Sequence, residues 1–159
     1  MKAYYQSPLG WAYIEANEQG ILSVSVKDIS PSDPADEHPL LAQCLRELEE
    51  YFAGQRTDFE VALAPKGTDF QQLVWQELLK IPFGKTLSYL QLARLLGDEK
   101  TIRAAAAANG KNPLWIIVPC HRVIGSDGSL TGYAGGLWRK KWLLEHEQKI
   151  KTGSTWTLF

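Results

Sequence analysis

The chain has no long apolar run, few cysteines and few histidines. Its 159 residues include two cysteines, three histidines and one methionine. No segment approaches the roughly 18 consecutive apolar residues of a membrane span, and the first residues lack the apolar core of a signal peptide. We therefore expect a soluble, cytoplasmic protein with no membrane partner.

The cysteines and histidines also lack the spacing of a disulfide framework or a metal site. Cys44 and Cys120 lie far apart, and a reducing compartment keeps both as thiols. No C-x-x-C or H-x-x-x-H pattern is present. Cys44 falls on the apolar stripe of a predicted helix, where a core role is the simplest interpretation. We expect neither a metal nor a cofactor.

Charge is divided unevenly along the chain. Residues 1–65 carry four Lys or Arg against eleven Asp or Glu, a net charge of −7, whereas residues 66–159 carry thirteen against seven, a net charge of +6. The basic part is suited to a polyanion such as nucleic acid. The alternative is that the two parts present faces of opposite charge to each other.

Residues 1–65 show the pattern of a small strand–helix domain. Alternating apolar residues between turn signals predict antiparallel strands near residues 4–5, 11–14 and 21–26. A Pro-broken loop at 30–36 precedes a helix over 41–52, which Gly54 ends. Residues 59–63 look like one more strand. Pro65 to Gly67 then marks a linker.

Residues 66–159 read as a mainly helical domain. Thr68 with Gln71, and Ser88 with Gln91, form possible capping boxes at the starts of two helices. Gly97 separates the second of these from a helix that continues to Ala108, which gives a helix-turn-helix. An apolar run at 116–118 predicts a buried strand, and a last amphipathic helix covers 138–144. The fold class is therefore α/β, with domains at 1–65 and 66–159.

The helix after Gly97 is unusually bare for a DNA-reading helix. Arg103 is followed by five alanines, which offer no polar groups to base edges in a major groove. Small side chains instead allow close approach to a narrow groove, and Arg103 could fill the space left by an extruded base. The alternative is an Ala-rich helix packed tightly inside the protein.

Cys120 is the candidate nucleophile. It follows the apolar run and precedes His121 and Arg122, where positive charge favours a thiolate. Because neighbouring residues of an extended chain point to opposite faces, His121 would act through a bridging water. Glu147 is a candidate to orient His121. Alternatively, the Cys-His pair is incidental.

The segment from Pro119 to Gly125, with the sequence PCHRVIG, resembles the methylated-DNA–protein-cysteine methyltransferases, also called O6-alkylguanine-DNA alkyltransferases. The resemblance extends from about Phe70 to Glu147. It includes further motifs in the family's order: Ser88-Tyr89, Arg103-Ala104, Asn112-Pro113 and Tyr133-Ala134-Gly135-Gly136-Leu137. The layout of the N-terminal part is similar to the family's small α/β domain.

The resemblance implies a single-turnover DNA repair reaction without a cofactor. Cys120 would take the alkyl group of O6-alkylguanine, and O4-alkylthymine is a further substrate to consider. His121, through water, and Glu147 would help to deprotonate Cys120. Tyr89 would donate a proton to the departing guanine, and Asn112 would hold the turn before the cysteine loop.

The same resemblance implies that the protein binds duplex DNA through the minor groove, and it would be associated with the nucleoid when it is on DNA. We expect a monomer, because the sequence shows no obvious further apolar face. Arg103 would intercalate. The further expected DNA contacts are Ala104, Ala105 and Tyr89, and the cations Lys100, Arg94 and Arg122 are expected to contribute through their charge. The implied base pocket is Val123, Tyr133, Ala134 and Gly135. Family members commonly continue after the arginine with Ala-Val-Gly, where this chain has Ala104-Ala105-Ala106.

Two other functions compete with alkyl transfer. A lesion-sensing or transcriptional helix-turn-helix protein would not need Cys120, and the alanine face argues against it. A cysteine hydrolase using Cys120 and His121 would turn over repeatedly, but the sequence has no convincing oxyanion motif.

Overall fold

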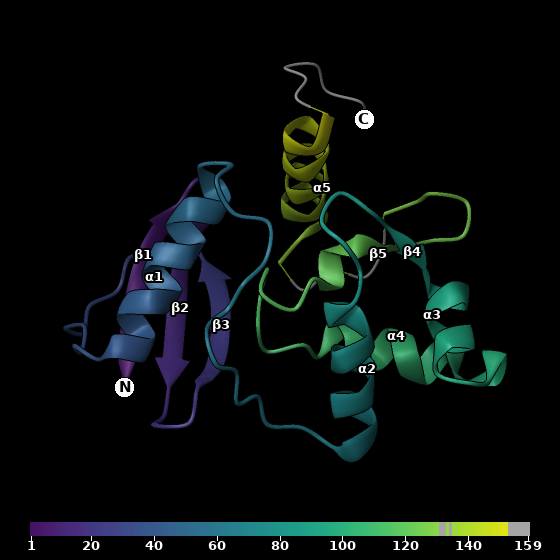
Figure 1. Ribbon diagram of the computed structural model, residues 1–159, viewed down its shortest axis with the longest axis horizontal. Coiled ribbons are helices and arrows are strands. Elements are labelled where there is room, and N and C mark those ends of the chain that lie inside the picture. The colour runs from purple at the N-terminus through teal and green to yellow at the C-terminus, as the bar shows by residue number, and fades with distance from the viewer. Residues whose placement is uncertain (131–132, 134, 153–159) are drawn as a thin grey trace. The chain divides into compact units, whose positions relative to one another are not determined.

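A computed structural model describes residues 1–130, 133 and 135–152. The chain divides into two compact units (Figure 1). The first contains Met1–Lys66 and Pro113–Ile117, and the second contains Gly67–Asn112 and the chain from Val118 onward. The α/β fold class is confirmed, with strands in the first unit and mainly helices in the second.

The first unit is a three-stranded antiparallel sheet with one helix. Strands β1 (Lys2–Ser7), β2 (Gly10–Ala16) and β3 (Ile21–Lys27) pair in chain order. Helix α1 (Pro39–Phe52) lies along one face of this sheet (Figure 1). Alternate residues of β2 are buried, as the period-two pattern predicts.

Helix α1 begins and ends at residues with clear local causes. The Nδ1 atom of His38 accepts a hydrogen bond from the Leu40 N–H at 3.1 Å and so caps the first turn. After Ala53 the chain turns at Gly54, which has a φ of 77°. The predicted glycine stop is confirmed, because a left-handed residue at this point suits glycine. Cys44 is fully buried on the stripe that faces the core.

The strand predicted over 59–63 is wrong. Only an isolated bridge between Ile21 and Leu63 forms. The backbone N–H groups of Glu60 and Val61 instead donate to the buried carboxylate of Glu47, at 2.8 and 3.1 Å. A side chain thus satisfies donors that a neighbouring strand would otherwise pair.

The buried strand predicted over 116–118 is also wrong. Pairing with β3 stops at a bridge between Val24 and Leu114. Ile116 then has a φ of 70°, and the Ile117 N–H donates to the Trp115 carbonyl at 2.8 Å. This tight γ-turn is rare for a β-branched residue and breaks any strand. Because of this bridge, Pro113–Ile117 belongs to the first unit. The single boundary expected at 65/66 places these residues in the second domain.

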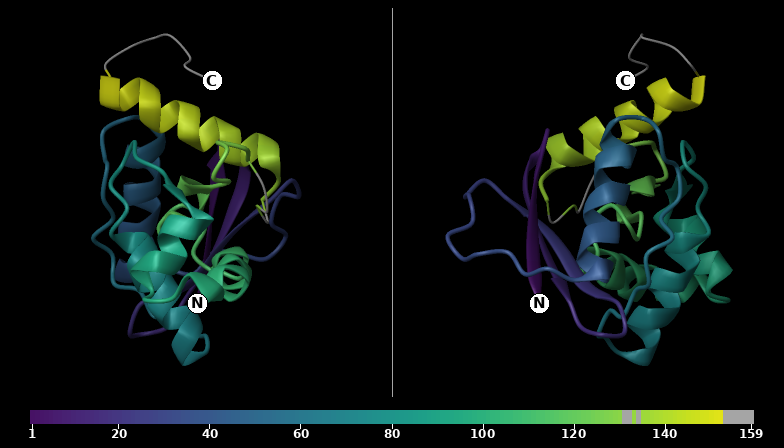
Figure 2. Two further views of the ribbon diagram at one scale, coloured as in Figure 1. Left: turned by 90° about the vertical axis from the view of Figure 1, so that its right-hand side faces the viewer. Right: turned by 60° about the vertical axis from the view of Figure 1, so that its left-hand side comes forward.

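The second unit contains four α-helices among its described residues. They are α2 (Asp69–Leu79), α3 (Tyr89–Leu95), α4 (Ile102–Gly110) and α5 (Leu137–Thr152). The capping boxes predicted at Thr68 and Ser88 are both confirmed. Helix α5 is a single unbroken rod (Figure 2).

Helices α3 and α4 form the expected helix-turn-helix. Gly97, with a φ of 98°, makes the turn, and Asp98 caps the short 3-10 helix η1 (Glu99–Thr101) that leads into α4. The Trp75 indole of α2 donates to the Ala108 carbonyl at 2.9 Å and ties α2 to the far end of α4. No helix within the described ranges is long and apolar enough to cross a membrane.

Candidate active site around Cys120

Cys120 begins a tight turn and does not continue a strand. Pro119 has φ −80° and ψ 62°, and the Cys120 N–H donates to the Val118 carbonyl at 2.7 Å, which is an inverse γ-turn. The 3-10 helix η2 (Cys120–Arg122) follows. Cys120 and His121 therefore do not lie on an extended chain with alternating side chains, and the turn fixes the directions of both side chains.

Two asparagines connect the end of α4 to this turn. The Asn112 amide donates to the Val118 carbonyl at 2.8 Å, and the Asn109 amide approaches the Cys120 carbonyl at 3.5 Å. Burial raises the pKa of the Cys120 thiol, and a hydrogen bond with the Asn112 side chain acts against that rise. These contacts support the holding role expected of Asn112. The sequence alone does not identify Asn109. The only signal for it is its position three residues before Asn112.

His121, Arg122 and Glu147 form a buried network between η2 and α5. The Glu147 carboxylate lies 2.6 Å from His121 Nε2 and accepts from Arg122 Nε at 2.8 Å. Arg122 also donates to the Ile81 carbonyl at 2.7 Å. Burial would raise the pKa of Glu147, but His121 and Arg122 outweigh it and hold that pKa well below its usual range. Glu147 is therefore an ionised acceptor.

This network fixes the tautomer of His121. An ionised carboxylate only accepts hydrogen bonds, so His121 Nε2 must carry a proton toward Glu147. Burial, with the nearby positive charges of Arg122 and Lys140, lowers the pKa of His121 against the opposing effect of Glu147. The ring is then neutral at pH 7, and its Nδ1 has no hydrogen-bond partner among the described residues. Nδ1 is free to act as a base.

Lys140 is a site residue that the sequence reading missed. It lies on α5 and is fully buried. Burial lowers its pKa to about 8, while the charge of Cys120 acts in the opposite direction. Burial raises the pKa of Cys120, and Lys140 is one of the groups that lower it. The available signal was helical spacing, because Lys140 is seven residues before Glu147 and so shares its face.

A short two-stranded sheet brings Tyr89 toward the cysteine turn. Strands β4 (Leu87–Ser88) and β5 (Val123–Ile124) pair in parallel directly before α3 and directly after η2. Tyr89 opens α3, and its ring centroid is 5.8 Å from Lys140 Nζ.

The structure describes three of the four residues that are expected to line the base pocket. Val123 is fully buried, and the Tyr133 ring centroid is 6.0 Å from Lys140 Nζ. Gly135 accepts a hydrogen bond from Arg139 at 2.9 Å. Ala134 lies outside the described residues, so its expected place in the pocket stays a prediction.

The expected DNA contacts separate into exposed and buried residues. Arg103, Ala104 and Lys100 are exposed, whereas Ala105 is fully buried on the face of α4 that packs on its neighbouring helices. Arg94 is exposed and bonded to Glu99 at 2.7 Å. The alanine helix therefore has one exposed face and one packed face, and the Ala105 side chain has no exposed surface with which to contact DNA.

The structure also corrects the expected role of Arg122 as a DNA contact. Arg122 was expected among the cations that face DNA, but only 6% of its surface is exposed. Glu147 accepts two of its hydrogen bonds, and its guanidinium carbon lies 5.7 Å from the Phe83 ring centroid. Its positive charge is thus used inside the protein to balance Glu147.

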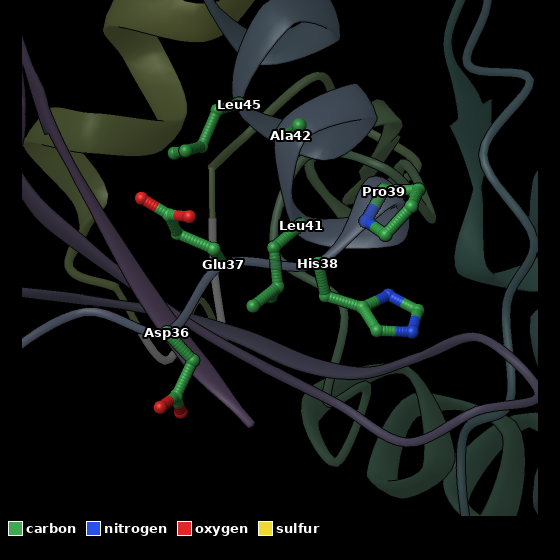
Figure 3. A pocket seen from close by; sticks show the side chains of 7 residues that line it. All are labelled: Asp36, Glu37, His38, Pro39, Leu41, Ala42 and Leu45. Atoms are coloured by element: carbon green, nitrogen blue, oxygen red, sulfur yellow. The ribbon is translucent and has the colours of Figure 1, made fainter.

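A hollow of about 510 Å³ lies at the start of α1 in the first unit. Figure 3 shows the Asp36 carboxylate and the His38 ring pointing in different directions, and His38 is occupied as the cap of α1. Across the described parts of the chain, no three His, Cys, Asp or Glu residues converge as metal ligands. The hollow offers no convergent chemistry.

Two family models match the chain. Residues 1–65 match the 6-O-methylguanine DNA methyltransferase, ribonuclease-like domain, and residues 69–149 match the 6-O-methylguanine DNA methyltransferase, DNA binding domain. Similar curated proteins carry the name methylated-DNA–protein-cysteine methyltransferase. The protein from Methanosarcina barkeri is 43% identical over 148 residues, covering 90% of this chain and 94% of its own. The constitutive protein of Bacillus subtilis is 41% identical over 153 residues, covering 91% and 93%.

Solved structures give the same result. The Mycobacterium tuberculosis O6-methylguanine methyltransferase matches with a TM-score of 0.82 and 41% identity over 94% of each chain. The M. tuberculosis protein OGT in complex with DNA matches with a TM-score of 0.84 and 40% identity, covering 94% of this chain and 93% of its own.

Proposed function

The chain belongs to the 6-O-methylguanine DNA methyltransferase family, with the activity of a methylated-DNA–protein-cysteine methyltransferase, and we propose that Cys120 is its alkyl acceptor. One observation carries this assignment. Cys120 lies on the turn that also holds His121, whose base nitrogen is free, whereas the other cysteine, Cys44, is fully buried and has a pKa raised to about 12 by burial and by Glu47.

In this mechanism His121 prepares the nucleophile. Nδ1 of His121 takes the thiol proton through a bridging water, and Glu147 holds the ring in the required tautomer. The sulfur then attacks the alkyl carbon on guanine O6 in one displacement step. The C–O6 bond breaks as the C–S bond forms, and Tyr89 donates a proton to the departing guanine. The thioether is stable, so each molecule reacts once.

The DNA is bound through the exposed part of the helix-turn-helix. Arg103 fills the space of the flipped base, with Ala104 allowing close approach in the minor groove and Lys100 contacting the backbone. The residues that line the pocket for the base are Val123, Tyr133, Ala134 and Gly135, and Tyr89 contacts the DNA. We propose that the protein acts as a monomer in the cytoplasm, and that its two domains are residues 1–65 and 66–159, except that Pro113–Ile117 belongs with the first.

Intact-protein mass spectrometry tests the acceptor. With excess duplex DNA containing O6-methylguanine, the protein should gain one methyl group, stop there, and carry it on Cys120. Cys120→Ser should gain none, and Cys44→Ser should react like the unmodified protein. Tight lesion binding without a mass gain would indicate a recognition protein, and repeated turnover would indicate a hydrolase. A methyl group on Cys44 would contradict the assignment.

Arg103 should matter more in duplex DNA than in single strands. Extruding a base from a duplex costs a few kcal/mol, so Arg103→Ala should slow methyl transfer from duplex by roughly tenfold or more. The same variant should react almost normally with a single-stranded oligonucleotide. Single-turnover rates on both substrates provide the measurement.

Lys111→Ala is the matched control for Arg103→Ala. Lys111 is an exposed cation at the other end of α4, so its loss also removes one positive charge. Lys111→Ala should reduce the salt dependence of DNA binding, and its effect on methyl transfer should be the same for duplex and single-stranded DNA. Equal slowing of Arg103→Ala on duplex and single strands would contradict the intercalating role.

A further inference from the structure

Asn109 is a buried polar side chain that the mechanism above does not use. It lies in the last turn of α4, and only 2% of its surface is exposed. Its amide nitrogen Nδ2 donates to the Cys120 carbonyl in a long hydrogen bond of 3.5 Å. Its Oδ1 has no hydrogen-bond partner among the residues that the structure describes. Buried polar atoms are normally paired, so this oxygen calls for a donor.

The Cys120 carbonyl fixes which end of the Asn109 amide faces it. A carbonyl oxygen only accepts hydrogen bonds, so turning the amide over would place two acceptors against each other. Nδ2 is therefore the atom that faces the Cys120 carbonyl. Oδ1 is bonded to the same carbon atom as Nδ2, so it also lies beside the cysteine turn, with its lone pairs available.

His121 presents a second buried acceptor beside the same cysteine. Its Nε2 carries the proton that faces Glu147, and its Nδ1 has no partner within the described part of the chain. Two acceptors cannot bond to each other, and the Cys120 thiol has a single proton to donate. A water molecule has two O–H donors and can accept from a thiol, and about three hydrogen bonds are usual for a buried water.

We propose that Asn109 is a positioning residue whose Oδ1 holds the water molecule that bridges the Cys120 thiol and His121 Nδ1. The inference rests on the proposed function of Cys120. The thiol proton passes to the water oxygen while one water proton passes to Nδ1, so the water is regenerated and a thiolate and an imidazolium form. The other water proton stays bonded to Oδ1. This bond keeps the water between the sulfur and the nitrogen.

The first experiment compares the unmutated chain with Asn109→Leu, which keeps a branched side chain without polar atoms. Iodoacetamide is the probe, no DNA is needed, and peptide mass mapping follows the modification rate of Cys120 against pH. Near neutral pH the variant should react roughly tenfold more slowly, because the reacting water has lost one hydrogen bond. At strongly alkaline pH hydroxide removes the thiol proton without the water bridge, so the two rates should converge.

The shape of this profile separates positioning of the water from support of the turn. A side chain that only supports the turn would slow the reaction by the same factor at every pH, and that result would overturn the proposal. Trp115→Phe is the matched control, because it removes another buried polar atom without a described partner. It should leave the Cys120 profile unchanged.

The other titratable groups around the turn are the same in all three proteins. The charges that act on Cys120 or His121 are those of Arg122 from η2 and of Lys140 and Glu147 from α5. Two phenols lie near the Lys140 ammonium, Tyr89 from α3 and Tyr133 from the loop before α5. Burial lowers the pKa of Lys140 to about 8. Because rates are compared at equal pH, this titration affects each protein alike.

The second experiment is a high-resolution crystal structure of the unmutated chain without DNA, so it does not depend on the folding of a variant. One water should lie within hydrogen-bond distance of Asn109 Oδ1, His121 Nδ1 and Cys120 Sγ. A water that bridges Sγ and Nδ1 but lies out of reach of Oδ1 would overturn the inference. If both experiments succeed but O6-methylguanine DNA transfers no methyl group, the proposed function fails while the water site stands.

Discussion

Glu147→Gln is expected to lose both stability and reactivity. The carboxylate is buried and accepts from Arg122, from His121 and from the Gly84 N–H. A neutral amide leaves the Arg122 charge buried without compensation, which costs about 3–5 kcal/mol of unfolding free energy. The amide can also donate to His121 Nε2, which would place the ring proton on Nδ1 and remove the base. Methyl transfer should slow by a hundredfold or more, on the order of a lost general base.

Glu47→Gln is the matched control for this variant. Glu47 is equally buried, but it lies in the other unit and accepts from the backbone N–H groups of Glu60 and Val61. This substitution should lower the melting temperature without slowing methyl transfer per folded molecule. Chemical denaturation and single-turnover rates at one temperature separate the two effects. Normal transfer by folded Glu147→Gln would show that Glu147 has no role in the chemistry.

The stability of the protein at low pH should depend on the Glu147 carboxylate. Its pKa is depressed in the folded state, so its contribution is fully present above the unfolded value of about 4.3. That contribution is lost as the pH falls toward the folded value. Glu147→Gln should therefore flatten the acid side of the stability profile measured by urea unfolding, whereas a profile as steep as that of the unmodified protein would contradict this assignment.

Local signals in the sequence were sufficient where the structure depends on local contacts. The capping boxes at Thr68 and Ser88, the turn at Gly97 and the glycine after α1 each involve residues within one or two turns of each other. The two strand predictions failed for the opposite reason. A strand needs a partner, and the segments near Val61 and Ile117 have their backbone groups satisfied by the Glu47 carboxylate and by tight turns.

The candidate active site likewise contains residues that the sequence indicates and residues that it does not. Cys120 and His121 are neighbours in a motif, so the sequence could indicate them directly. The burial of Arg122 could not be predicted locally, because its partners Glu147 and Ile81 are far away in the chain. Lys140 was missed because a lysine is ordinarily expected at the surface, and only the packed position of α5 places it inside.

Arg122→Met should be the second variant with a large effect, and it distinguishes an interior cation from a DNA contact. Removing the guanidinium leaves Glu147 charged and buried, which costs about 3–5 kcal/mol. It also removes one of the positive charges that lower the pKa of His121, so that pKa should rise. The neutral base then forms only at higher pH, and the low-pH limb of the transfer rate should move upward. The salt dependence of DNA binding should remain as it is, because the Arg122 guanidinium is buried against Glu147 and the Ile81 carbonyl.

The double variant Glu147→Gln with Arg122→Met separates folding from chemistry. With both charges gone, no uncompensated ion is left in the interior, so the double variant should be more stable than the sum of the two single losses predicts. It should still transfer methyl groups slowly, because His121 no longer has a carboxylate to fix its tautomer. Urea unfolding of all four proteins closes the cycle. Additive stability losses would mean that the pair is not coupled, and a reduced salt dependence in Arg122→Met would restore its assignment as a DNA contact.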